Sequence, residues 1–94
     1  MAKTKSKKLK KECPPDKVFY VCNGTVLKNV EQMLHELEKM EDGVFRYHVN
    51  ESKNDFSNWL KDVFKEAELA EKIRKVMDKH HIVEIIRTSS VPSK

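Results

Sequence analysis

The chain has 94 residues, of which 38% are hydrophobic and 36% are charged, and its net charge is +4. This composition fits one small, soluble and largely helical domain, and it is too apolar for a disordered chain. No apolar run approaches the ~20 residues that a membrane-spanning helix needs, and no apolar segment of a secretion signal follows the basic N-terminus. We therefore expect a cytoplasmic protein that does not enter a membrane.

The basic charge is concentrated at the N-terminus. Residues 1–12 hold six lysines against one glutamate, a net charge of +5, whereas the 13 basic and 14 acidic residues of the remainder give −1. The six are Lys3, Lys5, Lys7, Lys8, Lys10 and Lys11. Because Pro14 and Pro15 follow, and proline disfavours helix entry, we predict a disordered Lys-rich tail over residues 1–16.

Three functions remain open for this tail. It can bind RNA or DNA through the phosphates, in which case binding would weaken steeply with salt. It can be an inert tail that adds solubility, or it can dock on a membrane surface or an acidic partner. Since residues 1–12 contain no aromatic residue and no arginine, an arm of this kind would bind without stacking on bases and without sequence specificity.

Sequence motifs of several enzyme and metal-site classes are absent. Cys13 and Cys22 form no C-x-x-C pair and have no second pair to complete a zinc site, so we expect two free thiols. Two glycines are too few for a glycine-rich phosphate loop, and no HExxH or GxSxG occurs. We therefore predict a protein that is not an enzyme, with no catalytic residue, cofactor or metal.

The segment VFYVCNGTVLK has the pattern of a β-hairpin. Residues 18–21 are all β-branched or aromatic, which favours a strand. Asn23-Gly24 is the dipeptide preferred in two-residue hairpin turns, so Val26-Leu27 is predicted to form a very short return strand.

An amphipathic helix is predicted next. Its apolar residues follow helical spacing: Val30, Met33, Leu34, Leu37 and Met40. Asn29 is placed to cap its start, with Gln32 in the reciprocal capping position. Gly43 is expected to end it, because glycine readily adopts the left-handed conformation of a helix C-terminus. His35 lies off the apolar stripe and is expected to be exposed.

Residues 44–49, VFRYHV, alternate between two sides. Phe45, Tyr47 and Val49 share one side, which predicts a short strand or extended connection with the aromatic side inward. Such a strand could pair with the one predicted at residues 18–21.

Three further helical segments are predicted. The first begins at Asn54 or Ser52, both good N-caps, and its apolar residues are Phe56, Trp59, Leu60, Val63 and Phe64. The second carries Leu69, Ala70, Ile73, Val76 and Met77, with a break expected over residues 78–81. For residues 82–87, IVEIIR, we favour a helix over a strand, followed by a frayed tail over residues 89–94.

The segment YHVNESKNDFSNW gathers side chains that can carry chemistry. They form a candidate ligand-binding or structural polar cluster: His48, Asn50, Asn54, Asp55 and Asn58. As a site, His48 would act as a base or metal ligand oriented by Asp55, and the asparagines would bind an amide, a base or a sugar.

A structural interpretation also accounts for nearly every member of this cluster. Asn54 would cap the helix, and Asp55 would meet its dipole or form a capping box with Ser52. His48 would anchor the connection by donating to Asp55 or to a backbone carbonyl. We favour this interpretation and keep the binding site as an alternative.

A longer part of the chain, which includes this segment, resembles a family of small prokaryotic domains of unknown function. The likeness covers residues 17–75 and rests on Phe19, Gly24, Tyr47, His48, Asn54, Asp55, Phe56, Trp59, Asp62, Val63, Leu69 and Ala70. Most of these belong to a Y-H-x-N…N-D-F-x-x-W-x-x-D-V pattern. The resemblance implies an archaeal or bacterial source, and it implies no activity.

The predicted fold class is α+β and mostly helical, with a short N-terminal strand or hairpin packed with three to four helices. A single compact domain is expected over residues 17–88, with a core of Phe19, Leu34, Leu37, Phe45, Phe56, Trp59, Leu60, Val63, Leu69 and Ile73. For function we favour a non-enzymatic accessory protein whose Lys-rich tail engages nucleic acid or a ribonucleoprotein. The alternatives are a protein-interaction module with an inert tail, and a small-ligand or metal site at His48 and Asp55.

Overall fold

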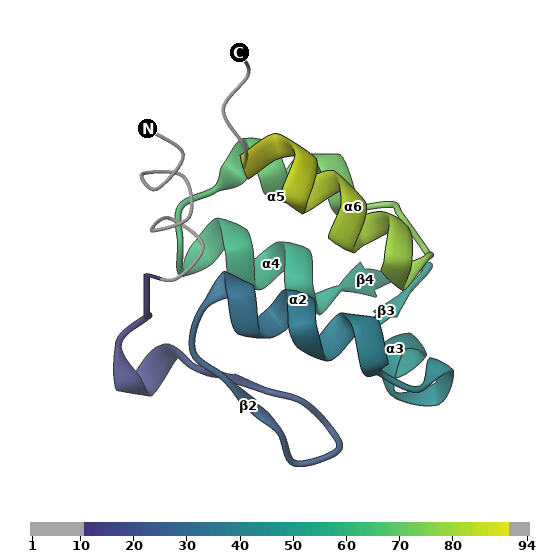
Figure 1. Ribbon diagram of the computed structural model, residues 1–94, viewed down its shortest axis with the longest axis horizontal. Coiled ribbons are helices and arrows are strands. Elements are labelled where there is room, and N and C mark those ends of the chain that lie inside the picture. Colours follow the sequence, from purple (N-terminus) through teal and green to yellow (C-terminus); the bar gives the residue numbers. More distant parts are fainter. Residues whose placement is uncertain (1–10, 91–94) are drawn as a thin grey trace.

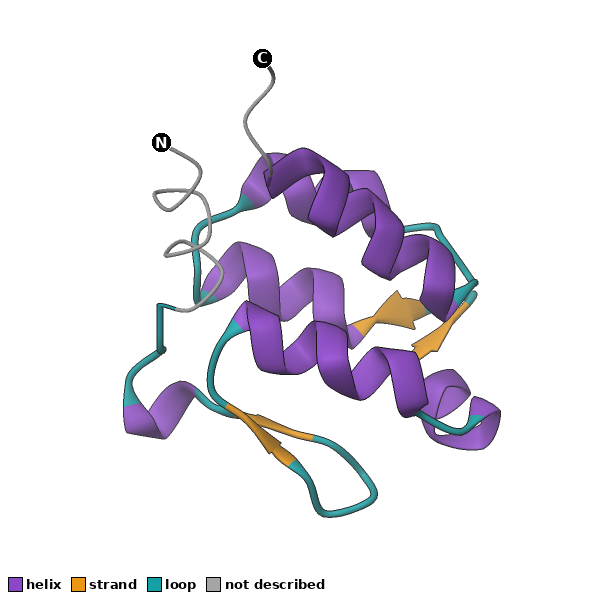
Figure 2. Ribbon diagram, in the orientation of Figure 1, coloured by secondary structure: helices purple, strands orange, loops and turns teal. Residues whose placement is uncertain are grey.

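The computed structural model describes residues 11–90 of the chain. This part contains one 3-10 turn, five α-helices and two antiparallel pairs of two-residue strands (Figures 1 and 2). The prediction of a mostly helical α+β fold is therefore confirmed. None of the described helices is long and apolar enough to cross a membrane. The predictions for residues 1–10 and 91–94 lie outside the described residues.

The secondary-structure elements are joined by short connections. They are η1 (Pro15–Lys17), β1 (Phe19–Tyr20), β2 (Val26–Leu27), α2 (Val30–Lys39), α3 (Asp42–His48), β3 (Val49–Asn50), β4 (Lys53–Asn54), α4 (Asp55–Asp62), α5 (Ala67–Ile73) and α6 (Lys79–Ser90). Helix α4 packs against α5, and α6 packs against both α2 and α5. The two small strand pairs lie at the edges of this helical body (Figure 2).

The predicted hairpin is present, with a longer turn than expected. Phe19 pairs with Leu27 and Tyr20 with Val26. The N–H of Val21 donates to the carbonyl of Thr25 (2.8 Å), which leaves three residues in the loop instead of two. Gly24 has a φ of +99°, a conformation that glycine adopts without a steric penalty, and it ends this three-residue turn.

The N-terminal segment is held on the domain by two hydrogen bonds. The N–H of Cys13 donates to the carbonyl of Lys28 (2.9 Å), and the indole Nε1–H of Trp59 donates to the carbonyl of Lys17 (2.8 Å). The half-buried Cys13 also packs against the core, and this burial raises the pKa of its thiol. The sequence predicts disorder up to residue 16, whereas the structure holds the chain from Cys13 onward, with η1 formed around the two prolines.

Helix α2 begins as predicted and ends differently. Asn29 Oδ1 accepts the N–H of Gln32 (2.7 Å), while Gln32 Oε1 accepts the N–H of Lys28 (2.8 Å), one residue before the cap. Gly43 does not end the helix: α2 stops at Met40, whose backbone is extended (φ −68°, ψ 138°), and Gly43 lies inside α3. The ammonium group of Lys79, from α6, binds the freed carbonyl of Met40.

The prediction of a strand over residues 44–49 is wrong. Residues 42–48 form α3, and only Val49 enters a strand, β3, which pairs with β4 and not with the first hairpin. Phe45 and His48 are buried at helical spacing, while Tyr47 is 60% exposed. The two buried residues, Phe45 and His48, are thus three positions apart, as on one face of a helix. The alternation of aromatic and polar side chains wrongly indicated a strand.

The later helices agree with the predictions, except at their ends. Asn54, not Ser52, is the N-cap of α4, so the predicted capping box of Ser52 and Asp55 does not form. Helix α5 already ends at Ile73, and Met77 is 51% exposed. The helix prediction for residues 82–87 is confirmed by α6, although the expected break lies before Lys79.

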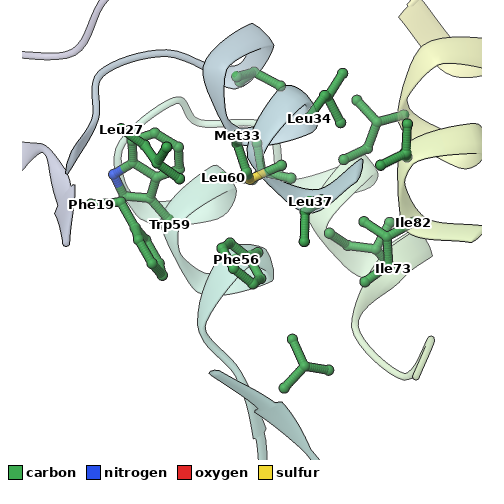
Figure 3. Packing of buried hydrophobic residues seen from close by; sticks show 14 of the residues in the cluster. Phe19, Leu27, Met33, Leu34, Leu37, Phe56, Trp59, Leu60, Ile73 and Ile82 are labelled. Atoms are coloured by element: carbon green, nitrogen blue, oxygen red, sulfur yellow. The ribbon is translucent and has the colours of Figure 1, made fainter. Parts of the chain in front are cut away.

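The interior is one continuous apolar cluster (Figure 3). All ten predicted core residues belong to it or pack against it, with Val63 only partly buried. Three residues of α6 complete the core: Ile82, Val83 and Ile86. Around Phe19 the contacts are aromatic, with ring centroids 4.8 Å from Phe56 and 5.5 Å from Trp59, so the first hairpin is attached to α4 chiefly by rings.

Replacing Trp59 tests this core. Trp59→Ala should lower the free energy of unfolding by about 3–5 kcal/mol, because it removes a buried ring and leaves a cavity. Trp59→Phe keeps one aromatic ring and loses the indole bond to the Lys17 carbonyl together with part of the buried ring volume, so it should cost less, about 1–2 kcal/mol. Urea denaturation monitored by circular dichroism measures both values. Equal midpoints for Trp59→Ala and the parent would contradict the core assignment.

Candidate functional site

His48, the last residue of α3, occupies the centre of the predicted polar cluster. Its side chain is almost fully buried, and its ring lies 5.1 Å from the ring of Phe19 and 5.5 Å from that of Phe56. Tyr47 contacts it edge-to-face at 5.0 Å from the outer side. The imidazole therefore extends the aromatic core at the point where the first hairpin meets α3 and α4.

Both ring nitrogens of His48 are engaged within the protein. The backbone N–H of Cys22 donates to Nε2 (3.0 Å), and Nδ1 lies 3.0 Å from Oδ2 of Asp55. Since a backbone N–H is always a donor, Nε2 must be the unprotonated nitrogen, and the ring proton then sits on Nδ1 and donates to Asp55. The histidine is thus a neutral bridge between the hairpin loop and α4.

A histidine paired with a carboxylate is the arrangement of a general base, but here its lone pair is occupied. A base or a metal ligand needs a free imidazole nitrogen, and the Cys22 N–H already uses the one available. Oδ2 of Asp55 also lies 3.1 Å from the ammonium of Lys53, so the carboxylate serves two partners. These contacts favour a structural role for the pair.

Asn54 is likewise used by the fold. Its Oδ1 accepts the N–H of Ser57 (3.0 Å) at the start of α4, and its Nδ2 donates to the carbonyl of Ile73 (2.9 Å) at the end of α5. Ser57 Oγ donates to the carbonyl of Ala70 (2.8 Å) one turn earlier. The side chains at the start of α4 thereby bind carbonyls in the last turn of α5, and the Ile73 carbonyl also accepts the N–H of Val76 (3.0 Å). Among the described residues, every buried polar side-chain atom has a partner.

Asn50 and Asn58 lie elsewhere, at the surface. Both line an open groove of about 600 Å³, which we call the turn groove. One side of the turn groove is the β3–β4 turn with the start of α4, and the other is the end of α5, with Arg74, Lys75 and Met77. Asn50 Oδ1 accepts the N–H of Ser52 (2.9 Å), which fixes the turn. Of the five predicted residues, His48 and Asp55 thus belong to the interior cluster and Asn50 and Asn58 to the groove, while the buried Asn54 reaches the floor of the groove as well.

The charges of the turn groove largely cancel. Lys53 is paired with Asp55, and Arg74 makes two bonds to Glu71, with Nε–Oε1 at 3.2 Å and Nη2–Oε2 at 3.0 Å. These bonds hold the pKa of Glu71 below and that of Arg74 above its ordinary value. Lys75 and the carboxylate of Glu51 also line the groove and have opposite signs. The groove is therefore rich in hydrogen-bonding groups and has little net charge.

Residues 11–90 contain no group of three histidine, cysteine, aspartate or glutamate side chains that could hold a metal ion. His48 and Asp55 supply only two such groups, and the third residue bonded there is Lys53, whose ammonium group is not a ligand. The described part of the chain thus offers no ligand set for a structural or catalytic metal.

Two sets of groups at these sites are missed by the sequence-based prediction. The backbone N–H of Cys22, 26 residues before His48, leaves no mark on the residue pattern. Arg74, Lys75 and Met77 follow the last residue of α5 and look in sequence like the basic end of an amphipathic helix. Only the packing of α5 against α4 brings them to the β3–β4 turn.

The tautomer of His48 can be measured directly. Long-range ¹H–¹⁵N NMR spectra at neutral pH should show the proton of His48 on Nδ1, because Nε2 accepts the Cys22 N–H. His35 is an internal control: it is exposed and contacts Glu31 through Nε2 (2.9 Å), so it should carry its proton on Nε2. A proton on Nε2 of His48 would contradict the arrangement.

Asn54 and Asn50 form a matched pair for stability measurements. Asn54→Ala should lower the free energy of unfolding by about 1–3 kcal/mol, because it removes the cap of α4 and the buried hydrogen bond to the Ile73 carbonyl, which keeps only the N–H of Val76 as a partner. Asn50→Ala breaks only exposed bonds and should cost about 0.5 kcal/mol or less. Chemical denaturation of both variants measures the two losses of unfolding free energy. Similar losses would show that Asn54 does not join the helices.

Comparison with known proteins identifies a family. Searches of the curated proteins and of the solved structures found no match. The model of a family of unknown function, DUF5752, matches residues 15–91. This range includes η1 and every α-helix of the described fold, and it leaves the lysine-rich N-terminus outside. The chain therefore belongs to the DUF5752 family, whose function is unknown.

Proposed function

We propose that this protein is a non-enzymatic accessory protein of the cytoplasm whose lysine-rich N-terminus binds RNA or DNA, free or in a ribonucleoprotein, without sequence specificity. The observation that carries the proposal is the separation of charge. Residues 1–12 have a net charge of +5 and the rest of the chain −1. Attraction to phosphates must then come from the N-terminal segment, because the nearly neutral domain supplies almost none.

The attachment of this segment supports the proposal. Lys11 and Glu12 are exposed, and among the described residues the chain is first held on the domain at Cys13. In Figure 1 this point lies at one end of the molecule, beside η1. Lys11, the last of the six lysines, therefore lies at the surface, where a polyanion can approach it.

The interior polar cluster supports binding over catalysis. The ring nitrogens of His48 and the amide of Asn54 are engaged by backbone groups and by Asp55. A reaction at this cluster would have to break hydrogen bonds that hold the fold. A small-ligand or metal site at His48 and Asp55 is disfavoured for the same reason.

A protein-interaction module is the second candidate. Tyr20 is 71% exposed and Val26 41% exposed, and the two are paired across the outer face of the first hairpin. An exposed apolar pair of this kind is typical of contact surfaces, although it is small. Under this alternative the lysines are inert, and partner capture would not change when they are removed.

Removal of the basic segment tests the proposal. Fluorescence anisotropy should show that the full chain binds mixed RNA and DNA oligomers, with the logarithm of affinity falling by about 4 per tenfold rise in salt if six lysines contact a single strand. A chain of residues 13–94 should lose this binding. The control is the full-length chain with all six lysines replaced by glutamine, which keeps the length and should behave like the truncated one.

Two results would contradict the proposal. The full chain would fail to bind either nucleic acid at low salt, or the truncated chain would bind as tightly as the full one.

A further inference from the structure

We propose that the turn groove holds the bases of a single-stranded nucleic acid, so that the domain prefers single strands to duplexes. This inference rests on the proposed function, since the lysine-rich segment would supply most of the affinity. It goes beyond that function by assigning a second contact surface and a class of nucleic acid. Its evidence is the kind of side chains at the groove and the balance of their charges.

An exposed aromatic ring stands at the rim of the turn groove. Tyr47 is 60% exposed, and the ammonium of Lys53, which lines the groove, lies 5.1 Å from the centre of its ring. An exposed aromatic ring is a usual platform for an unpaired base, and a base that stacks on the face under Lys53 would take the place of its ammonium group. His48 supports the ring from the inner side at 5.0 Å, so the platform is held in place.

Neutral polar groups gather beside this platform. Asn58 projects from α4 and is exposed, and Ser52 and Asn50 belong to the β3–β4 turn. Amides and hydroxyls both donate and accept hydrogen bonds, which suits the edges of unpaired bases. Lys75, on the opposite side, could contact one phosphate. The groove thus offers hydrogen-bonding groups and one unpaired cation, and the ring of Tyr47 next to it offers a stacking surface.

The charge balance decides between single strands and duplexes. Lys53 and Arg74 are neutralised by Asp55 and Glu71, so the turn groove attracts phosphates weakly. A duplex presents mainly phosphates to a protein surface and keeps the faces of its bases stacked, so it gains little here. A single strand exposes base faces and edges, and stacking of one base is worth about tenfold in affinity.

The basic segment joins the domain far from the turn groove, and the two can be changed separately. Figure 1 shows η1, where the basic segment joins the domain, at one end of the molecule and the β3–β4 pair at the other. A strand that touches both must run along the domain. Substitutions at the groove therefore leave the lysines and their phosphate contacts unchanged.

The test compares a single-stranded oligonucleotide with a duplex of equal phosphate number, by anisotropy on the full chain. The parent should bind the single strand about tenfold more tightly. Tyr47→Ala should lose most of this preference and leave duplex affinity unchanged, while Tyr47→Phe, which keeps the ring, should retain it. Asn58→Ala should weaken single-strand binding by a smaller factor. Because Asn58 is an exposed helix residue, this variant keeps the test valid if Tyr47→Ala unfolds.

The outcomes separate the inference from the proposed function. Equal binding of single strand and duplex by the parent, or an unchanged preference in both Tyr47→Ala and Asn58→Ala, would overturn the groove and leave the lysine-rich segment as the binding element. Single-strand binding that keeps the affinity of the parent after the six lysines become glutamine would support the groove and count against the segment. Failure of the parent to bind either molecule would overturn both.

Discussion

The side chain of Asn54 joins two helices in the interior of this small domain. Its oxygen accepts an N–H at the start of α4, and its amide donates to the last carbonyl of α5. Ser57 repeats the link one turn away, on the carbonyl of Ala70. Helix ends leave backbone groups unpaired, and burying them without partners is costly, so these side chains help the start of α4 to pack beside the end of α5. The position of α6, which lies on α5, depends on this arrangement in turn.

A second bridge attaches the N-terminal hairpin to this pair of helices. His48 receives the N–H of Cys22 on one nitrogen and faces Asp55 with the other, while Phe19 stacks on Phe56 below it. The polar residues that look most like a catalytic site in the sequence are therefore the ones that hold three segments together. Their buried polar atoms have hydrogen-bond partners within the protein. We therefore look for the binding groups at the surface.

At the surface the molecule separates its positive charge from its hydrogen-bonding groups. The lysines gather in residues 1–12, and the turn groove carries amides, a hydroxyl and ion pairs that cancel. Phosphate attraction is long-ranged and sequence-independent, whereas base contacts act only at short distance. In the function we propose, the first captures a nucleic acid and the second selects its single-stranded form. The DUF5752 match starts at residue 15, so it includes the groove and excludes the lysines.

The sequence by itself determined the features that depend on local spacing. The apolar stripe of α2, the cap at Asn54, the hairpin at Gly24 and the buried ring of Trp59 all follow from neighbours within a few residues. The helix at residues 42–48 could not be recognised in this way, because a seven-residue helix has too few turns for its period to be told from that of a strand.

Tertiary structure alone decided where α2 ends and which polar residues meet. The Met40 carbonyl is bound by Lys79, 39 residues away, His48 by Cys22, 26 residues away, and Asn54 by Ile73, 19 residues away. Each partner is a backbone group or a flexible lysine, which any sequence can supply. Their pairing is set by the packing of helices around the shared core, and no local pattern encodes it.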